Sequence, residues 1–267
     1  MLEVGISLQR GVSRDPRVTR VGDSHSSRTI MSDFVPLTIG SGLLVDLAGD
    51  AAPTRVWGWR TSALALDADA THYGMTVSGG GTLECGAGRF ALQAGMFFVL
   101  PGAGRVEGGA GMVVSRLGYR GLFQLGGPVE ATGRLHYIDG CSDTLLVCPP
   151  VLGEPCLNHL HMPPGTNQTA HTHPSERIGV IVRGTGECRT PGGTFALRAG
   201  MGWRIPAGCL HSFFTRGESL DVLAWHPDSD FGPTHDHHPM LNRTMVDGVS
   251  AAEIDEIRTT RPSLLEA

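Results

Sequence analysis

An internal repeat indicates that this chain of 267 residues adopts a fold in which one structural unit occurs twice. Shifted by 105 residues, positions 74–101 align with 179–206 without a gap, and 12 of the 28 positions are identical. The identical pairs are Gly74/Gly179, Val77/Val182, Gly79/Gly184, Gly81/Gly186, Gly88/Gly193, Phe90/Phe195, Ala91/Ala196, Leu92/Leu197, Ala94/Ala199, Gly95/Gly200, Met96/Met201 and Pro101/Pro206. Many are glycines, which set tight turns. The chain is therefore predicted to contain two copies of one structural unit.

Both copies consist of short apolar runs separated by glycine and proline, as in residues 75–84, 89–102 and 177–187. Runs of this length between turn residues are typical of strands in a sandwich or barrel. A helical signal occurs only near the end, where Ser250 and Glu253 form a capping box. We therefore predict an all-β protein with a short C-terminal helix.

Composition narrows the class of protein further. A net charge of −5 without a basic block argues against nucleic acid as the main partner. No run approaches the 18 apolar residues of a spanning helix, and no secretory signal is evident, so no membrane partner is expected. The six cysteines are scattered without a CxxC pair, which favours reduced thiols and a cytoplasmic location. Residues 1–35 lack any sustained pattern and are interpreted as a disordered leader.

Three histidines of the second copy carry the strongest chemical signal. His171 and His173 are two residues apart, so on a strand both side chains would point to one face. His211 follows a Pro-Gly turn, where a neighbouring strand can bring its imidazole alongside the other two. Three neutral imidazoles on a rigid β wall form a metal site with open positions. We interpret His171, His173 and His211 as ligands of one divalent metal ion.

These histidines also lie in two stretches that resemble the signature motifs of the cupin superfamily. The first motif is matched by Gly165, His171, His173 and Gly184, and the second by Gly200, Pro206, Gly208 and His211. The resemblance and the repeat together imply a bicupin, with two tandem double-stranded β-helix, or jelly-roll, barrels. The implied domains are an N-terminal barrel over 36–140, a metal-binding C-terminal barrel over 141–245, and a C-terminal helix and tail over 246–267.

The sequence departs from the family pattern at the acidic ligand. Counting back from Gly184 places Arg177 where cupins usually carry a glutamate, and Glu176 lies one residue earlier. A shift of one residue on a strand reverses the face of the side chain. Two interpretations follow. Either Glu176 reaches the metal through a bulge, or the site has three histidines and Arg177 binds a carboxylate of the substrate. We favour the second.

The first copy lacks these ligands. The 105-residue shift maps the three histidines onto Leu66, Ala68 and Val106, and maps Arg177 onto His72. The first barrel is therefore expected to bind no metal in this way. His72 is interpreted as a structural or pocket-lining residue.

Further histidines have two interpretations each. His159 and His161 share one face of the strand before the metal motif, where they either line the pocket as proton carriers or face outward. Within residues 225–240, a loop rich in Pro, Gly and Asp either holds a second metal or closes over the site as a lid. Its histidines are His226, His235, His237 and His238.

The leading hypothesis is a mononuclear non-heme Fe(II) dioxygenase that acts on a small polar, carboxylate-bearing molecule and O2. Arg177 would bind the substrate anion, and His159 and His161 would carry a proton. One alternative is a redox-neutral Zn(II), Ni(II) or Mn(II) enzyme, that is, an isomerase, a lyase or an N–N bond-forming enzyme. Another is a non-catalytic bicupin that binds a small ligand. A monomer and a homodimer are both left open.

Overall fold

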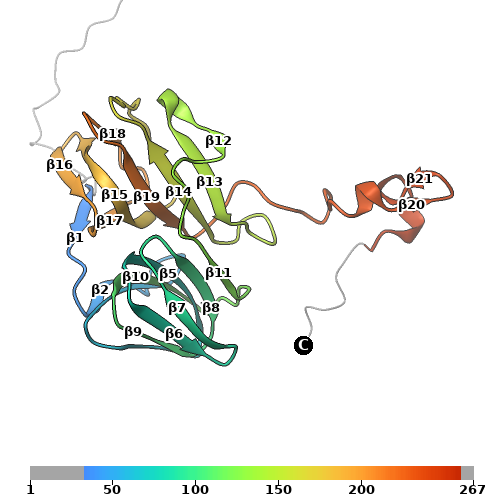
Figure 1. The fold of residues 1–267 in the computed structure, drawn as a ribbon. Helices are drawn as coiled ribbons and strands as arrows, with labels where there is room; N and C mark the ends of the chain where they lie inside the picture. The colour runs from blue at the N-terminus through green and yellow to red at the C-terminus, as the bar shows by residue number, and fades with distance from the viewer. Residues whose placement is uncertain (1–32, 260–267) are drawn as a thin grey trace, which may run out of the picture. The chain divides into compact units, whose positions relative to one another are not determined.

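The computed structural model describes residues 33–259, whose regular secondary structure is almost entirely β-strands (Figure 1). The first set of strands comprises β2 Gly42–Leu47, β3 Thr54–Arg60, β4 Leu64–Leu66, β5 Ala70–Ser78, β6 Gly81–Cys85, β7 Gly88–Leu92, β8 Phe97–Pro101, β9 Gly104–Glu107, β10 Ala110–Leu117 and β11 Gln124–Gly126. They form one sheet in the order β11-β8-β5-β10-β3-β2 and a second in the order β4-β9-β6-β7. The first set is thus a two-sheet, jelly-roll-like sandwich.

The second set comprises β12 Leu135–His136, β13 Ser142–Val147, β14 Cys156–Met162, β15 Arg177–Thr190, β16 Gly193–Arg198, β17 Gly202–Ile205, β18 Ser212–Phe214 and β19 Leu220–His226. The main sheet has the order β1-β17-β15-β19-β14-β13-β12, and the long β15 also pairs with β16 and β18. The pairings recorded in residues 33–259 leave the sheets of both sets open, without a continuous closed barrel.

The repeated sequence forms corresponding strands in the two sets. Residues 74–101 form most of β5 with β6, β7 and β8, and 179–206 form most of β15 with β16 and β17. Gly179 pairs with Trp203, and at the equivalent position Gly74 pairs with Phe98. A Cβ on either glycine would lie within 2.6 Å of the partner's ring. The repeated glycine therefore leaves room for an aromatic ring across the backbone in both copies.

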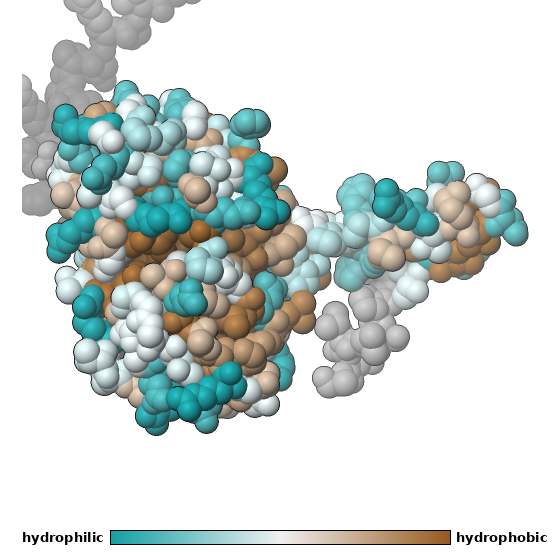
Figure 2. Space-filling model, in the orientation of Figure 1, coloured by the Kyte–Doolittle hydropathy of each residue, from teal (hydrophilic) through white to brown (hydrophobic). Residues whose placement is uncertain are grey.

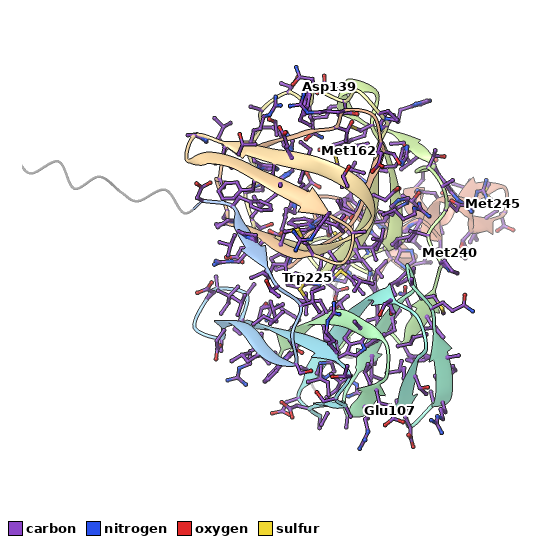
Figure 3. All side chains as sticks on the ribbon, turned by 60° about the vertical axis from the view of Figure 1, so that its left-hand side comes forward. Glu107, Asp139, Met162, Trp225, Met240 and Met245 are labelled. Carbon is purple, nitrogen blue, oxygen red and sulfur yellow. The ribbon has the colours of Figure 1, made fainter. Side chains whose placement is uncertain are left out.

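The main sheets of the two sets pack against each other through one apolar cluster. Tyr73 and Val114 of the first set lie in this cluster with Val180, Leu223 and Trp225 of the second. The rings of Tyr73 and Trp225 are 5.8 Å apart between centroids, and Figure 3 labels Trp225 where the two sets meet. Because side chains alternate along a strand, the residues of β19 that neighbour Leu223 and Trp225 in the sequence face away from the first set. That opposite face carries the candidate site.

The start of the chain differs from the predicted boundary. Strand β1, Val35–Leu37, pairs with β17 of the second set, and Phe34 is buried in that set's core. The predicted leader, 1–35, therefore overlaps structured residues at its end, whereas residues 1–32 lie outside the described part. Burial of Phe34 beside Phe195, with ring centroids 5.1 Å apart, explains why this end is ordered.

The predicted C-terminal helix takes the form of two separate 3-10 turns, Ala251–Glu253 and Asp255–Ile257. Ser250 caps the first turn as expected, because its hydroxyl accepts from the Ala252 amide. The two turns do not join into one helix. A helix this short needs tertiary packing to be stable, and Ile257 is 54% exposed rather than packed. The segment also includes the 3-10 turn Leu241–Arg243 and the hairpin of β20, Met245–Val246, and β21, Val249–Ser250. Its exposed methionines and valines appear as apolar surface in Figure 2.

None of the helices in residues 33–259 is both long and apolar enough to cross a membrane. All six cysteines are free thiols, and four of them are buried.

Candidate metal centre

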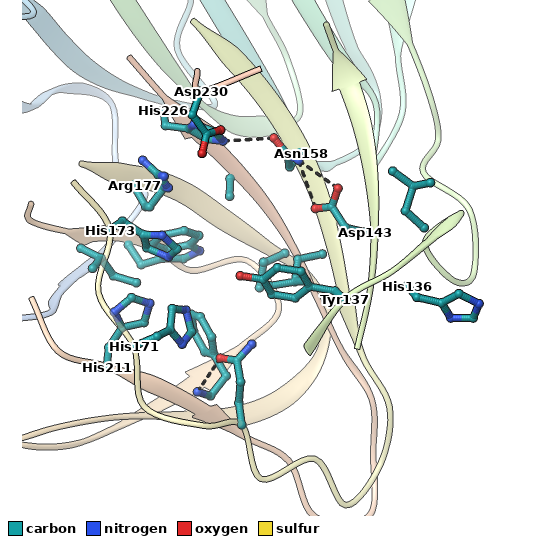
Figure 4. A pocket seen from close by; sticks show the side chains of 18 residues that line it. His136, Tyr137, Asp143, Asn158, His171, His173, Arg177, His211, His226 and Asp230 are labelled. Carbon is teal, nitrogen blue, oxygen red and sulfur yellow. Dashed lines mark hydrogen bonds between the residues drawn. The ribbon is translucent and has the colours of Figure 1, made fainter. Parts of the chain in front are cut away.

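Three histidine rings meet at one end of a cavity in the second set. One ligand nitrogen each from His171, His173 and His211 can be chosen so that all three lie within 4.8 Å of one another. The ring centroids are 4.5 to 5.2 Å apart. Within residues 33–259 this is the only histidine, cysteine or carboxylate cluster that could hold a metal. Figure 4 shows the three rings at the left of the cavity.

The backbone that carries these rings is fixed by hydrogen bonds between the two motifs. His171 and His211 exchange backbone hydrogen bonds of 2.9 Å in each direction, as one isolated antiparallel bridge. The Gly208 amide donates to the His173 carbonyl at 2.8 Å. Gly208 has a φ of +71°, which favours glycine at this turn. His171 and His173 therefore lie outside the regular strands, contrary to the strand predicted for them, and are positioned by the second motif.

Hydrogen bonds to the backbone select the ring nitrogens that remain for a metal. Nδ1 of His171 lies 2.9 Å from the Thr169 carbonyl, and Nδ1 of His211 lies 2.9 Å from the Cys209 carbonyl. A carbonyl only accepts, so both Nδ1 atoms carry the proton and both Nε2 atoms keep a lone pair. Such a carbonyl contact is what metal-bound histidines ordinarily make through their second nitrogen. The donor set fits a divalent metal ion.

Burial keeps the imidazoles of His173 and His211 neutral. It lowers the pKa of His173 to about 3 and that of His211 to about 4, and the positive charge of Arg177 acts in the same direction. Neutral imidazoles are the form that binds metals.

Arg177 and Glu176 point to different places. Arg177 lines the cavity, and Figure 4 shows it between His173 and His226. Glu176 is not brought into the histidine group. Its carboxylate accepts from Arg204, at 2.9 Å from Nε and 2.5 Å from Nη2. Adjacent residues at the start of a strand face opposite ways, and here the alternation is not interrupted by a bulge.

His159 and His161 do not line this cavity, contrary to the expectation that they carry protons there. Both donate to Oδ1 of the buried Asp221, at 2.8 and 2.9 Å. They lie on the same face of β14 as Leu157, which packs toward the first strand set, whereas Asn158 and Leu160 line the cavity. The two histidines are thus on the back of the sheet, with Arg183 as a further partner of Asp221.

The histidine-rich loop is divided. His226 lines the cavity, whereas His235, His237 and His238 are exposed and belong to no metal-competent cluster within residues 33–259. A second metal site in this loop is therefore not supported. Asp230 of the same loop does line the cavity, so part of the loop borders the site.

Several cavity residues were missed from the sequence. The cavity has a volume of about 380 Å³. Tyr137, Asp143 and Asn158 face it from β13, β14 and the residues that precede them (Figure 4). No spacing rule links these residues to the histidine motifs, because their position depends on how β13 adds to the sheet.

In the first set, two of the positions equivalent to the histidines are occupied by buried apolar side chains. Leu66 and Val106 are buried in an apolar cluster with Trp59 and Phe98. His72 is buried, with Nδ1 2.8 Å from the Ser115 hydroxyl and Nε2 2.9 Å from the Asp67 carbonyl. Both ring nitrogens are satisfied within the protein, which is the arrangement of a structural histidine.

Comparison with known proteins agrees with this description. The family model described as Cupin domain matches residues 158–226, a stretch that contains the three histidines. No curated protein matches the chain. Similar solved structures include a cupin 2 conserved barrel domain protein from Leptotrichia buccalis, at 12% identity over 75% of this chain and 91% of that chain, with a TM-score of 0.51. An IolB-like protein from Salmonella typhimurium LT2 is similar at 13% identity over 77% and 98% of the two chains, with a TM-score of 0.54.

A salicylate 1,2-dioxygenase from Pseudaminobacter salicylatoxidans is also similar, at 12% identity over 70% of this chain and 76% of that chain, with a TM-score of 0.53. A mutant of that enzyme in complex with gentisate gives a TM-score of 0.51 at 11% identity, over 75% of each chain. At such identities the likeness concerns the fold. The chain therefore has the cupin fold, and its residues 158–226 match the Cupin domain model.

Proposed function

We propose that this protein is a metal-dependent bicupin enzyme in which His171, His173 and His211 hold one divalent metal ion. The observation that carries the proposal is the pair of Nδ1–carbonyl bonds, which leaves the Nε2 lone pairs of His171 and His211 free within a convergent group. The repeated strand pattern supports two cupin units, and the apolar filling of the first supports a single metal site in the second.

The substrate in this proposal is a small molecule with a carboxylate, bound by Arg177. Among the described residues, only Nη1 of Arg177 is engaged, by the Ser175 hydroxyl at 2.7 Å and by the carbonyls of Ser175 and Glu176. Nε and Nη2 therefore remain for a bidentate anion. A cavity of about 380 Å³ accommodates a molecule of this size. The similar dioxygenase binds gentisate, itself a small carboxylate.

We favour Fe(II) and a dioxygenase reaction, in which O2 is the second substrate. Bound at these histidines, Fe(II) would supply redox chemistry with O2, whereas Zn(II), Ni(II) or Mn(II) would supply a Lewis acid. The chain's own contribution is to hold the carboxylate at Arg177, next to His173, and to surround it with Trp203, Ile205 and Phe213. The six free thiols support a cytoplasmic location.

Elemental analysis of untagged protein is the first test. We expect close to one iron per chain in the wild type and its loss in His211→Ala. Glu176→Gln is the matched control, and it should retain the metal because its side chain pairs with Arg204. Loss of metal in Glu176→Gln would contradict the three-histidine site. A preparation without metal, even after anaerobic reconstitution, would leave a ligand-binding protein as the better interpretation.

Oxygen consumption with a panel of small carboxylates tests the reaction. Arg177→Ala should keep the metal and raise KM by about 100-fold, which corresponds to the loss of a charge-assisted hydrogen-bonded pair. Arg177→Lys should recover only part of the affinity, because an ammonium cannot form the bidentate contact. Substrate turnover without O2 would overturn the dioxygenase and favour the redox-neutral enzyme.

A further inference from the structure

A chain of three polar side chains crosses the cavity wall opposite the histidine group. Asp143, Asn158 and His226 come from the neighbouring strands β13, β14 and β19, and all three line the cavity. Nδ2 of Asn158 lies 2.9 and 3.1 Å from the two carboxylate oxygens of Asp143. Oδ1 of Asn158 lies 3.1 Å from Nε2 of His226. Figure 4 shows these contacts as one continuous line.

The far nitrogen of His226 has a fixed role. Nδ1 lies 2.9 Å from the backbone carbonyl of Asp228, which can only accept a hydrogen bond. Nδ1 therefore carries a proton in every state of the ring. Only Nε2, the atom that contacts Asn158, gains or loses one.

An amide that lies between two titratable groups can form a hydrogen bond with each of them in only two arrangements. In the orientation drawn, Asn158 donates to an ionised Asp143 and accepts from a protonated Nε2 of His226. With the amide turned over, it donates to an unprotonated Nε2 and accepts from a protonated Asp143. Each arrangement contains one proton at one end, and both have the same net charge. If both ends are protonated or both are not, one contact joins two donors or two acceptors.

We propose that Asp143 and His226 are a coupled acid–base pair, joined by the Asn158 amide, in which proton uptake at one end accompanies proton release at the other. The inference rests on the proposed function in taking this cavity as the place where substrate binds. The amide does not conduct the proton. Starting from the arrangement with a neutral His226, Asp143 gives its proton to the bound molecule, Nε2 of His226 takes one from another atom of that molecule, and the amide turns over. The substrate thereby has one proton moved between two of its atoms, and no net charge is transferred.

Burial and the charged groups around His226 favour a ring that is neutral at rest, with a lone pair on Nε2, and therefore the arrangement in which the amide is turned over and Asp143 is protonated. Burial lowers its pKa to about 4, the positive charge of Arg177 from β15 acts in the same direction, and Asp228 and Asp230 of the following loop partly oppose this. The thiol of Cys156 lies 3.1 Å from both ring nitrogens, so it favours neither as the protonated atom.

The surroundings of Asp143 raise its pKa, whereas those of His226 lower the pKa of the imidazole. Burial raises the pKa of its carboxyl group, against the opposing effects of the Asn158 hydrogen bond and of His159 on the back of the sheet. Tyr137, from the segment before β13, and the Cys156 thiol of β14 also interact with the charge of Asp143. The two ends therefore approach each other in proton affinity, which is the condition for exchange between them.

Nuclear magnetic resonance of ¹⁵N-histidine-labelled, metal-loaded protein tests the pair without any substrate. The His226 signal is assigned by its loss in His226→Gln. We expect the neutral ring to carry its proton on Nδ1. Asp143→Asn should lower the His226 pKa by about one unit, the size of coupling at which two groups titrate as a pair. In an Asn158→Leu background the same substitution should have little effect, because the amide connection is absent.

Asp230→Asn is the control for charge alone, since Asp230 acts on His226 through space. Equal shifts from Asp143→Asn with and without Asn158 would overturn the proposal, because the coupling would then be purely electrostatic. A neutral ring protonated on Nε2 would also overturn it. Metal content measured on the same samples reports separately on the histidine site, so failure of the metal proposal is not confused with failure of the pair.

Discussion

Acidifying the metal-free protein from pH 7 to pH 5 is expected to lower its free energy of unfolding by about 4 kcal/mol through two histidines of the candidate site. In the folded chain, burial lowers the pKa of His173 to about 3 and that of His211 to about 4, from an ordinary value of 6.5. At pH 5 the unfolded chain therefore binds nearly two more protons than the folded chain.

The sign and the size follow from linkage. Because the unfolded state binds more protons, stability rises with pH, and it falls as the pH drops below 6.5 until the folded-state values near 4 and 3 are reached. Between pH 7 and pH 5 each histidine contributes about 2 kcal/mol, at about 1.4 kcal/mol per pKa unit. Asp143 acts in the opposite direction, because burial raises its pKa, whereas His226, whose pKa burial lowers to about 4, adds a further loss. The figure of about 4 kcal/mol is therefore the share of His173 and His211 alone.

Urea unfolding of chelator-treated protein at pH 7, 6 and 5 measures the effect, and the buried Trp203 and Trp225 serve as fluorescent reporters. His173→Gln and His211→Gln should each reduce the pH-dependent loss by about 2 kcal/mol. His237→Gln, on the exposed loop, is the matched control and should leave it unchanged. Equal losses in all four proteins, or none in the wild type, would refute the reasoning.

The other predictions concern packing, the acidic residue and the metal. Gly179→Ala should destabilise the protein by about 3 kcal/mol, because its Cβ would lie 1.9 Å from the Leu223 carbonyl oxygen. If urea unfolding shows a loss of free energy of unfolding below about a tenth of that size, the close approach is contradicted. Glu176→Gln should cost about 1 kcal/mol of stability, through its half-buried pair with Arg204, and should not change metal content. Added Zn(II) should raise the Tm of the chelated wild type but not of His211→Ala, measured by calorimetry.

Patterns that repeat along the chain were predictable because they follow local rules. The pair Gly74 and Gly179 indicated a repeated unit, and both glycines make room for an aromatic ring from the next strand. The spacing of His171 and His173, with His211 after a Pro-Gly turn, was sufficient to predict a group of three imidazoles. That these residues are joined by an isolated bridge, outside regular strands, depended on contacts between the two motifs.

The direction of individual side chains was decided by the tertiary structure. The sequence by itself determined that His159 and His161 share one face of a strand and that Glu176 and Arg177 face opposite ways. Which face meets the cavity depends on where the first strand set packs, and that set covers the side of β14 that carries Leu157. Period-two alternation defines two faces but does not distinguish them, because only a second layer of structure makes one face core and leaves the other to line a site.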